Sequence, residues 1–263
     1  MPQSPRPRAG DDRHAPAPSA PTLLVGMLLA AAVALGGCGG AEPLATAPPS
    51  TTAAPPQSPA QRLAARVAAA KDARYAARYT LRTNGRQDRT VAVEIARDGS
   101  WRIDVPGGAH GGAQDVAVVG TTDGTYQCAL GGAVSCVKIA DARRGVPSRY
   151  DVRVHHPFTD WLDVLSDPKQ ALSVDKDNSL SVPKGDCFSV EPNAAALAPP
   201  MDPGIYCYHA DGVLTGARFG GRTLVLAGGV AKPGTSISLP GPVTDGRALG
   251  TEAPPSPTPS TSP

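Results

Sequence analysis

The residues best suited to chemistry in this sequence are its five cysteines. A thiol can be acylated, oxidised to a disulfide or used as a metal ligand. Cys38 stands apart from the others, near the start of the sequence. The other four are Cys128, Cys136, Cys187 and Cys207. We therefore expect one chemistry for Cys38 and a different one for the later four.

The residues before Cys38 have the layout of a secretory signal peptide. Residues 1–21 are polar and carry three arginines, and residues 22–35 (TLLVGMLLAAAVAL) are apolar without a charge. This apolar run is shorter than the ~20 residues that a helix needs to cross the hydrocarbon core of a bilayer. We expect residues 1–37 to be a cleaved signal peptide and not a permanent transmembrane anchor.

The apolar run ends in Leu35-Gly36-Gly37-Cys38, which resembles the lipobox of bacterial lipoproteins. This resemblance implies that the thiol is acylated and that Cys38 becomes the new N-terminus. Two or three acyl chains attach a protein lastingly to a membrane, whereas one chain binds reversibly. We expect lipid such as palmitate on Cys38, and a protein held at the extracytoplasmic face of the cell membrane. The alternative is a secreted protein cleaved near Ala34 with a free Cys38 thiol.

Export to an oxidising compartment favours disulfides among the later four cysteines, whose number is even. Three pairings are possible. We favour Cys128 with Cys136 and Cys187 with Cys207, because each pair flanks a short segment that can fold as a hairpin or loop. A zinc site of four thiolates is the alternative, but the sequence contains no Cys-x-x-Cys spacing.

The adjacent histidines His155 and His156 are the other feature that could bind a metal. Adjacent side chains on a strand point to opposite faces, so two such histidines do not easily share an ion. We therefore expect a surface or helix-entry position for this pair.

The common signatures of hydrolases, nucleotide-binding proteins and metalloproteases are missing from the sequence. His209 lies beside the Asp211-Gly212 turn, but no nucleophile is spaced to suit it. Asp160 and Asp163 are three residues apart on an expected helix, and we interpret them as part of a solvated face. The sequence therefore predicts no enzyme, cofactor or metal site.

Composition limits the size of the folded part. The 29 glycines and 29 prolines are concentrated towards the two ends of the chain. A net charge of +2 does not indicate a nucleic-acid-binding surface. Residues 38–57 are rich in Pro, Ala and Thr, and residues 244–263 are rich in Pro, Ser and Thr. We expect both segments to be disordered. One domain over residues 58–243 remains.

Two helices are expected in this domain. Ser58-Pro59-Ala60-Gln61 has the pattern of a capping box, which predicts a helix to about Ala70. A second helix is indicated where Phe158, Trp161, Leu162 and Leu165 fall on one face. Thr159 is its expected cap, and Pro168 its expected end.

The rest of the domain alternates between apolar and polar residues, which predicts antiparallel strands. The strands are joined by turns at Asp98-Gly99, Asp123-Gly124 and Asp211-Gly212. The expected fold class is therefore α+β, with an N-terminal helix and one inserted helix on an antiparallel sheet.

Trp101 and Trp161 each fall on a predicted apolar face. The first interpretation is core packing between sheet and helix. The second is that both side chains line the mouth of an apolar cavity that binds acyl chains as a ligand.

Two features of the sequence resemble a known family. One is the order of leader, lipobox, helix and hairpins, and the other is the pair of segments 185–188 (GDCF) and 206–214 (YCYHADGVL). Over most of residues 60–240 the chain resembles actinobacterial lipoproteins related to the LolA-like half-barrel superfamily. That resemblance implies a strongly curved antiparallel sheet around a helical lid, with lipid or acyl chains in the hollow. It carries over no ligand-contact residue.

Three functions compete at this point. The first is a non-catalytic domain that binds lipid or another amphipathic ligand at the cell envelope. The second is a signal-sensing or assembly lipoprotein that binds an exported protein partner and no small molecule. The third, a wall-modifying hydrolase, needs a cleft with paired carboxylates or a nucleophile and base.

Overall fold

The computed structural model describes residues 56–142, 144–167, 169–193 and 200–253. The expected signal peptide, Cys38, most of the expected linker, Pro168 and the end of the expected tail lie outside these residues. No helix within the described part of the chain is long and apolar enough to cross a bilayer.

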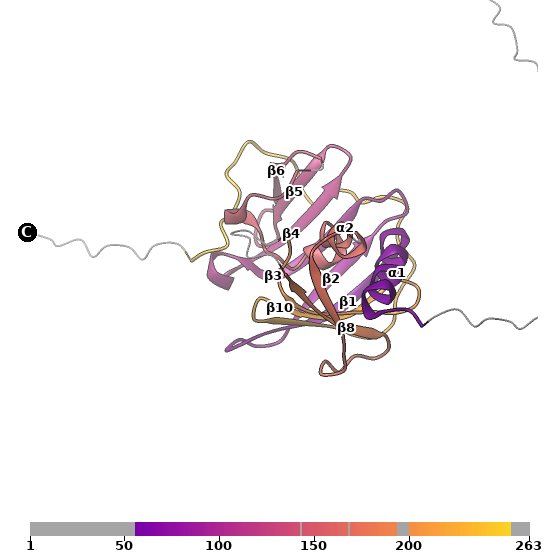
Figure 1. Ribbon diagram of the computed structural model, residues 1–263. Helices are drawn as coiled ribbons and strands as arrows, with labels where there is room; N and C mark the ends of the chain where they lie inside the picture. Colours follow the sequence, from indigo (N-terminus) through magenta and orange to yellow (C-terminus); the bar gives the residue numbers. More distant parts are fainter. Residues whose placement is uncertain (1–55, 143, 168, 194–199, 254–263) are drawn as a thin grey trace, which may run out of the picture. The chain divides into compact units, whose positions relative to one another are not determined.

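Strands dominate the described domain, which holds a single 11-stranded antiparallel sheet in the order β6-β5-β4-β3-β2-β1-β11-β10-β9-β8-β7 (Figure 1). The sheet is not closed, and β6 and β7 are its two edges. The strands are β1 Tyr75–Thr83, β2 Arg89–Ile95, β3 Trp101–Ala109, β4 Gln114–Thr121, β5 Gly124–Ala129, β6 Ser135–Ala140, β7 Leu172–Asp177, β8 Asp186–Pro192, β9 Gly204–Tyr208, β10 Leu214–Phe219 and β11 Arg222–Leu226. The expected antiparallel sheet is confirmed, although the fold contains more strand and less helix than α+β implies.

The strand order requires one long crossing of the sheet. Strands β1 to β6 run outward in sequence, and β7 to β11 return from the opposite edge until β11 pairs with β1. Residues 141–171, here called the crossing segment, connect the two edges; of these, 143 and 168 are not described. It contains the short helices η2 Ser148–Tyr150 and η3 His156–Phe158, and α2 Trp161–Ser166.

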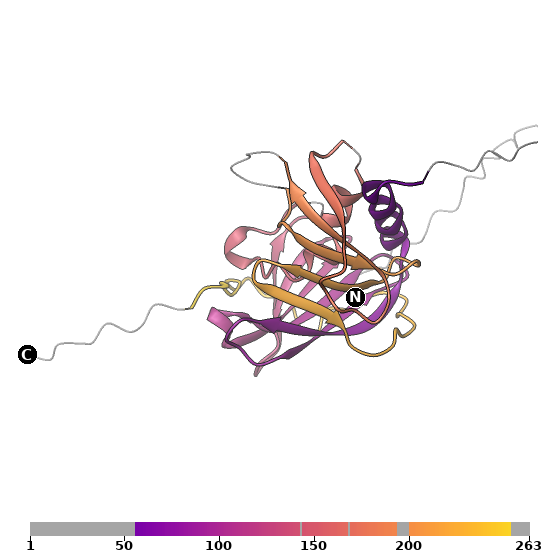
Figure 2. The ribbon, with the colours of Figure 1, turned by 60° about the horizontal axis from the view of Figure 1, so that its bottom comes forward.

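The sheet curves, and α1 and α2 lie on its concave side (Figures 1 and 2). The helix α1 Pro59–Asp72 contacts α2, β7 and β9, and it buries Leu63 and Val67 in the main hydrophobic core. Its capping box is present as predicted, because Gln61 N donates to Ser58 Oγ at 3.2 Å and Ser58 N donates to Gln61 Oε1 at 2.9 Å.

The second helix is shorter than expected and lacks the expected cap. It begins after Asp160, and no side chain within the described ranges caps its N-terminus. The Thr159 hydroxyl instead donates to the carbonyl of His155 at 3.0 Å, so the prediction of a Thr159 cap is wrong. The physical reason is the preceding 3-10 turn, which places that carbonyl within reach of the hydroxyl.

Strand periodicity explains which residues enter the core. In β1 the buried side chains alternate with more exposed ones, as a half-buried strand requires. Strand β4, third from the β6 edge of the sheet, is buried on both faces. Val118 faces the concave core, while Val119 belongs to a cluster covered by Ile237 and Leu239. The C-terminal residues thus provide a second layer over one end of the sheet.

Two disulfides join neighbouring strands in the pairing favoured above. Cys128 on β5 is bonded to its register partner Cys136 on β6, and Cys187 on β8 to its partner Cys207 on β9. Each bridge lies in a small apolar cluster separate from the main core. The bridges therefore tie together the outer strands on both sides of the sheet.

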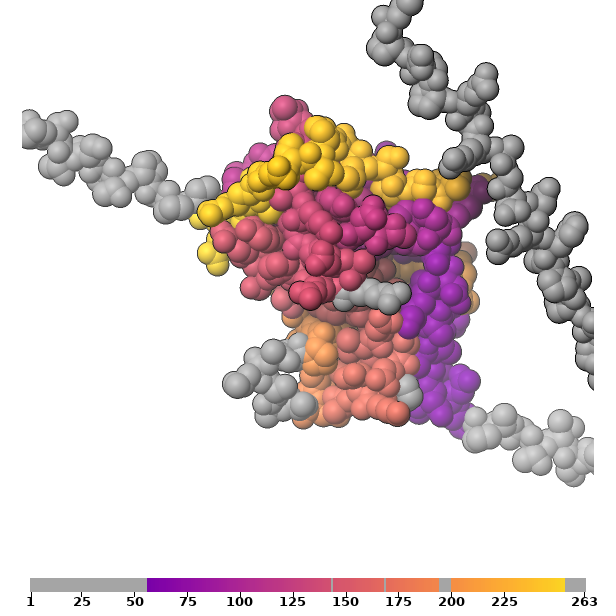
Figure 3. Space-filling view, turned by 90° about the horizontal axis from the view of Figure 1, so that it is seen from above, coloured from indigo at the N-terminus to yellow at the C-terminus, as the bar shows by residue number. Residues whose placement is uncertain are grey.

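The folded part extends beyond residue 243, so the expected boundary of the tail is wrong for residues 244–253. Thr244 N donates to Cys136 O at 2.9 Å, and Leu249 N donates to Gln127 Oε1 at 2.6 Å. Thr251 N donates to Arg149 O at 2.9 Å. Figure 3 shows this segment, in yellow, lying along the surface of the domain. Most of this segment is attached to the domain by backbone hydrogen bonds and not by apolar side chains. Its composition can therefore be as polar as that of a linker.

We expect Gly212→Ala to destabilise the protein more than Gly99→Ala. Both glycines have a positive φ, 85° and 87°, which costs an alanine about 1 kcal/mol. A Cβ at Gly99 meets no atom of the described residues within 4 Å, whereas a Cβ at Gly212 would overlap the α1 backbone at Ala69 and Ala70. Displacing α1 should cost roughly 1–3 kcal/mol more. Urea unfolding of both variants measures the difference, and equal losses would contradict the packing described here.

Candidate functional site

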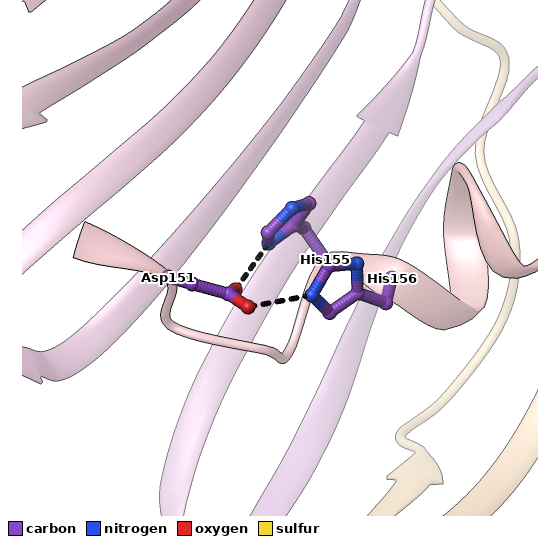
Figure 4. Close-up of side chains that lie close together, drawn as sticks. All are labelled: Asp151, His155 and His156. Carbon is purple, nitrogen blue, oxygen red and sulfur yellow. Dashed lines mark hydrogen bonds and ion pairs between the residues drawn. The ribbon is translucent and has the colours of Figure 1, made fainter. Parts of the chain in front are cut away.

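The crossing segment carries a partly buried cluster of two histidines and two carboxylates. His156 Nε2 lies 2.9 Å from Asp151 Oδ2, and His156 Nδ1 lies 2.7 Å from Asp160 Oδ1. His155 Nδ1 lies 3.9 Å from Asp151 Oδ1. Figure 4 shows the Asp151 carboxylate facing both imidazole rings. We call these four residues the histidine cluster.

Local backbone geometry brings the two adjacent rings together. Phe158 N donates to His155 O and Thr159 N to His156 O, both at 3.0 Å, so the chain turns here and forms no strand. The ring centroids of His155 and His156 are only 4.2 Å apart. The expected opposite-face geometry is therefore wrong, and with it the argument against a shared ion.

Of the two positions expected for this pair, surface or helix entry, the first does not apply, because His155 and His156 are 3% and 8% exposed. The expected helix-entry position is confirmed, since η3 leads directly towards α2.

The two tryptophans bracket the histidines in a stack of four rings. Trp101 stacks on His155 with centroids 5.8 Å apart, and His156 stacks on Trp161 with centroids 4.9 Å apart. Trp161 is buried and also meets Phe219 edge-on. Core packing thus accounts for Trp161. Trp101 is half-buried and lines a pocket of about 270 Å³ together with α2 residues.

The two histidines have opposite electrostatic environments. Burial alone would lower the pKa of His156, but its hydrogen bonds to Asp151 and Asp160 outweigh burial and raise the pKa to about 9. Burial, together with the nearby His156 charge, lowers the pKa of His155 to about 4. Near neutral pH, His156 is therefore an imidazolium between two carboxylates, and His155 is neutral.

A second feature, here called the arginine pocket, adjoins the cluster and shares Asp151 with it. Its volume is about 300 Å³, at the lower end of small-ligand sites. Its apolar walls include Leu81, Val105, Val152 and Val154. Its cationic residues are Arg86, Arg89, Arg153 and Arg222. Only one carboxylate, that of Asp151, lines the described pocket, so it carries an excess of positive charge.

Three of these arginines have no carboxylate of the described residues within 4.0 Å. Arg86 donates to Gly111 O at 2.7 Å, Arg89 to Pro106 O at 3.0 Å, and Arg222 to Gly220 O at 3.3 Å. Burial and the neighbouring Arg153 charge lower the pKa of Arg222. The positive potential of the pocket is therefore only partly neutralised.

Glycines at the end of β3 and in the 3-10 turn η1 His110–Gly112 that follows it make room for two of the guanidinium groups. A Cβ at Gly107 would overlap the Arg89 guanidinium, and a Cβ at Gly112 would overlap that of Arg86. The glycine-rich segment 107–112 indicates that other groups approach its backbone closely, but no sequence pattern shows that these groups are the side chains of Arg86 and Arg89.

Other residues considered from the sequence lie apart from the arginine pocket. Asp163 is exposed and pairs with Lys71 of α1 at 2.6 Å, as a solvated helix face predicts. Asp160 is also exposed, but it reaches back to His156. His209 lies 2.8 Å from Asp211 at an exposed turn. Cys38 lies outside the described residues.

Comparison with known proteins adds no assignment. No protein-family model matches the sequence, and a comparison with curated proteins gives no significant match. The fold and the geometry described above therefore carry the functional argument.

We expect the free energy of unfolding to fall on both sides of neutral pH. The His156 pKa of about 9 exceeds its unfolded value of 6.5, so its contribution is complete below pH 6.5 and is lost as the pH rises through 9. The His155 pKa of about 4 lies below 6.5, so stability is also lost as the pH falls from 6.5 towards 4. The alkaline loss should be on the order of 3 kcal/mol.

Urea unfolding at a series of pH values measures both slopes. His156→Gln should abolish the alkaline loss, whereas His209→Gln, which changes an exposed histidine beside a carboxylate, should keep it. An unchanged alkaline slope in His156→Gln would show that another group is responsible.

Proposed function

We propose that this protein is an exported lipoprotein, attached through lipid on Cys38, whose domain binds an anionic amphiphile without catalysis at the extracytoplasmic face of the membrane. The observation that carries the proposal is the arginine pocket, which combines apolar walls with partly unneutralised arginines. A charged headgroup needs the arginines, and an acyl or alkyl chain needs the apolar walls.

The position of the pocket fits a ligand that enters from the end of the curved sheet. The concave face itself is occupied by the crossing segment, with Phe158 against Tyr79 and Trp161 against Phe219. A chain bound between sheet and helices would have to displace these rings. The arginine pocket offers a route that leaves them in place, because Val152 and Val154 belong to both the pocket and the core.

The proposed attachment and kinship rest on several observations taken together. The lipobox-like sequence before Cys38 motivates lipidation, and the two disulfides are typical of an oxidising compartment. An open, curved antiparallel sheet with helices on its concave side supports kinship with LolA-like half-barrels. These features suit a protein that handles lipid at the cell envelope.

A second function, binding of an exported protein partner without a small-molecule ligand, is favoured by one observation. The concave side is packed with aromatic side chains from the sheet and the crossing segment. A solid core suits a domain that acts through its surface. Crosslinking on intact cells, followed by identification of the captured protein, tests this alternative.

We expect the full chain to bind dodecyl phosphate and to bind neither dodecanol nor dodecyltrimethylammonium with comparable affinity. Isothermal titration below the micelle concentration measures the binding. Arg86→Gln combined with Arg222→Gln should weaken dodecyl phosphate binding about tenfold or more, because two charge-assisted contacts are lost.

The matched control is Arg82→Gln, which removes an exposed arginine that pairs with Asp88 and does not line the pocket. Equal affinity for the anionic and cationic amphiphiles would contradict the proposal. So would an unchanged affinity in the double variant.

Lipidation is tested separately by metabolic labelling with palmitate in the host. The wild-type protein should incorporate label, and Cys38→Ala should incorporate none. The paired variant Cys128→Ala with Cys136→Ala removes a disulfide instead and should still be labelled. Label that persists in Cys38→Ala would refute attachment at this thiol.

A further inference from the structure

The histidine cluster contains three metal-ligand atoms in a small space. Asp151, His155 and His156 each offer one ligand atom, and these atoms all lie within 4.8 Å of one another. In a tetrahedral zinc site with bonds of 2.0–2.2 Å the ligand atoms lie about 3.3–3.6 Å from one another, so a pair that is 4.8 Å apart must approach by roughly 1.2–1.5 Å to share one ion.

One of these atoms has no partner within the described part of the chain. His155 Nδ1 is buried without a hydrogen bond, although it lies 3.9 Å from the Asp151 carboxylate. A buried polar atom without a partner costs stability and calls for a physical explanation. Its neighbours are a carboxylate and a second imidazole, which are the ligand types that zinc-class ions select.

His156 is also held in the orientation of a metal-binding histidine. Its Nδ1 contacts the Asp160 carboxylate at 2.7 Å, while its Nε2 faces Asp151. Histidines that bind metals commonly donate their second ring N–H to a carboxylate, which fixes the ring and its tautomer. Asp160 is placed to accept that hydrogen bond while Nε2 binds an ion.

We propose that Asp151, His155 and His156 form a binding site for a divalent transition metal ion of the zinc class, with Asp160 orienting His156. Binding replaces the proton on His156 Nε2 with the ion and releases that proton to solvent, so charge and atoms balance. His155 Nδ1 gains the partner that it lacks. The three protein ligands leave a fourth position of a tetrahedral ion for water or another ligand.

This inference does not rest on the proposed amphiphile binding. The two features share Asp151. The arginines and the histidines can nevertheless be changed independently, so each proposal can fail without the other.

Isothermal titration of the full chain with ZnCl2 tests the site. All proteins carry Cys38→Ala, so that no thiol outside the two disulfides can bind zinc. The chain should bind one Zn²⁺. His155→Ala should weaken that binding about 100-fold or more, and Asp160→Asn should weaken it about 10-fold to 100-fold.

Two matched controls should leave zinc affinity unchanged. Asp163→Asn alters an exposed carboxylate on α2, the helix that begins after Asp160. The Asp163 carboxylate pairs with Lys71 and not with the histidines. His209→Ala removes an exposed histidine beside Asp211. If His155→Ala does not fold, the comparison of Asp160→Asn with Asp163→Asn still decides the question.

Cobalt provides a second readout on the unmodified site. Co²⁺ should give visible absorption bands of a tetrahedral or five-coordinate complex, and Zn²⁺ should displace it. The absence of stoichiometric zinc binding would overturn the proposal. Equal binding by Asp160→Asn and Asp163→Asn, or by folded His155→Ala and His209→Ala, would overturn it as well.

Discussion

The crossing of the sheet by residues 141–171 is the constraint on which the rest of the structure depends. Strands β1 to β6 and β7 to β11 run in the same direction along the strand order, the first set ending at one edge of the sheet and the second starting at the other, and β11 pairs with β1. The connection between β6 and β7 must therefore span the sheet from edge to edge. In doing so it supplies His155, Phe158 and Trp161, which are buried.

A connecting segment that enters a hydrophobic core carries polar side chains and backbone groups into it. The pairing of these groups explains why the core of this domain contains histidines and carboxylates. A buried polar group is costly unless it finds a partner. Several polar groups of the crossing segment have such partners. Tyr208 donates its hydroxyl to Pro157 O at 3.3 Å, and Arg153 pairs with Asp202 between β8 and β9. His156 pairs with carboxylates on both sides. Among the described residues of the crossing segment, His155 Nδ1 is the buried side-chain atom that has no partner, and this is why we infer an ion site there.

Local sequence signals predicted the local structure well. The capping box at Ser58, the Asp-Gly turns and the nearest-neighbour disulfides each depend on residues close together in the chain. The pairing of β11 with β1 joins residues far apart, and alternation reports only which face a side chain occupies. The alternation of apolar and polar residues therefore could not predict the strand order.

The errors have physical causes of the same kind. Residues 244–253 look like a linker because their composition is polar, yet their backbone groups bond to β6, Gln127 and Arg149. The prediction that the two histidines point apart assumes strand geometry, whereas a 3-10 turn brings their rings together. The arginine pocket collects residues from β2, the loop before it, the crossing segment and β11, which no local motif connects.

The most direct test of the central claim is native mass spectrometry of the protein released from the membranes of its own host. The account predicts a non-covalent anionic amphiphile on the acylated wild-type chain, and its loss when Arg86 and Arg222 are both replaced by glutamine. A wild-type chain whose mass contains only the polypeptide and its covalent lipid would contradict the account, as would cargo retained by the double variant.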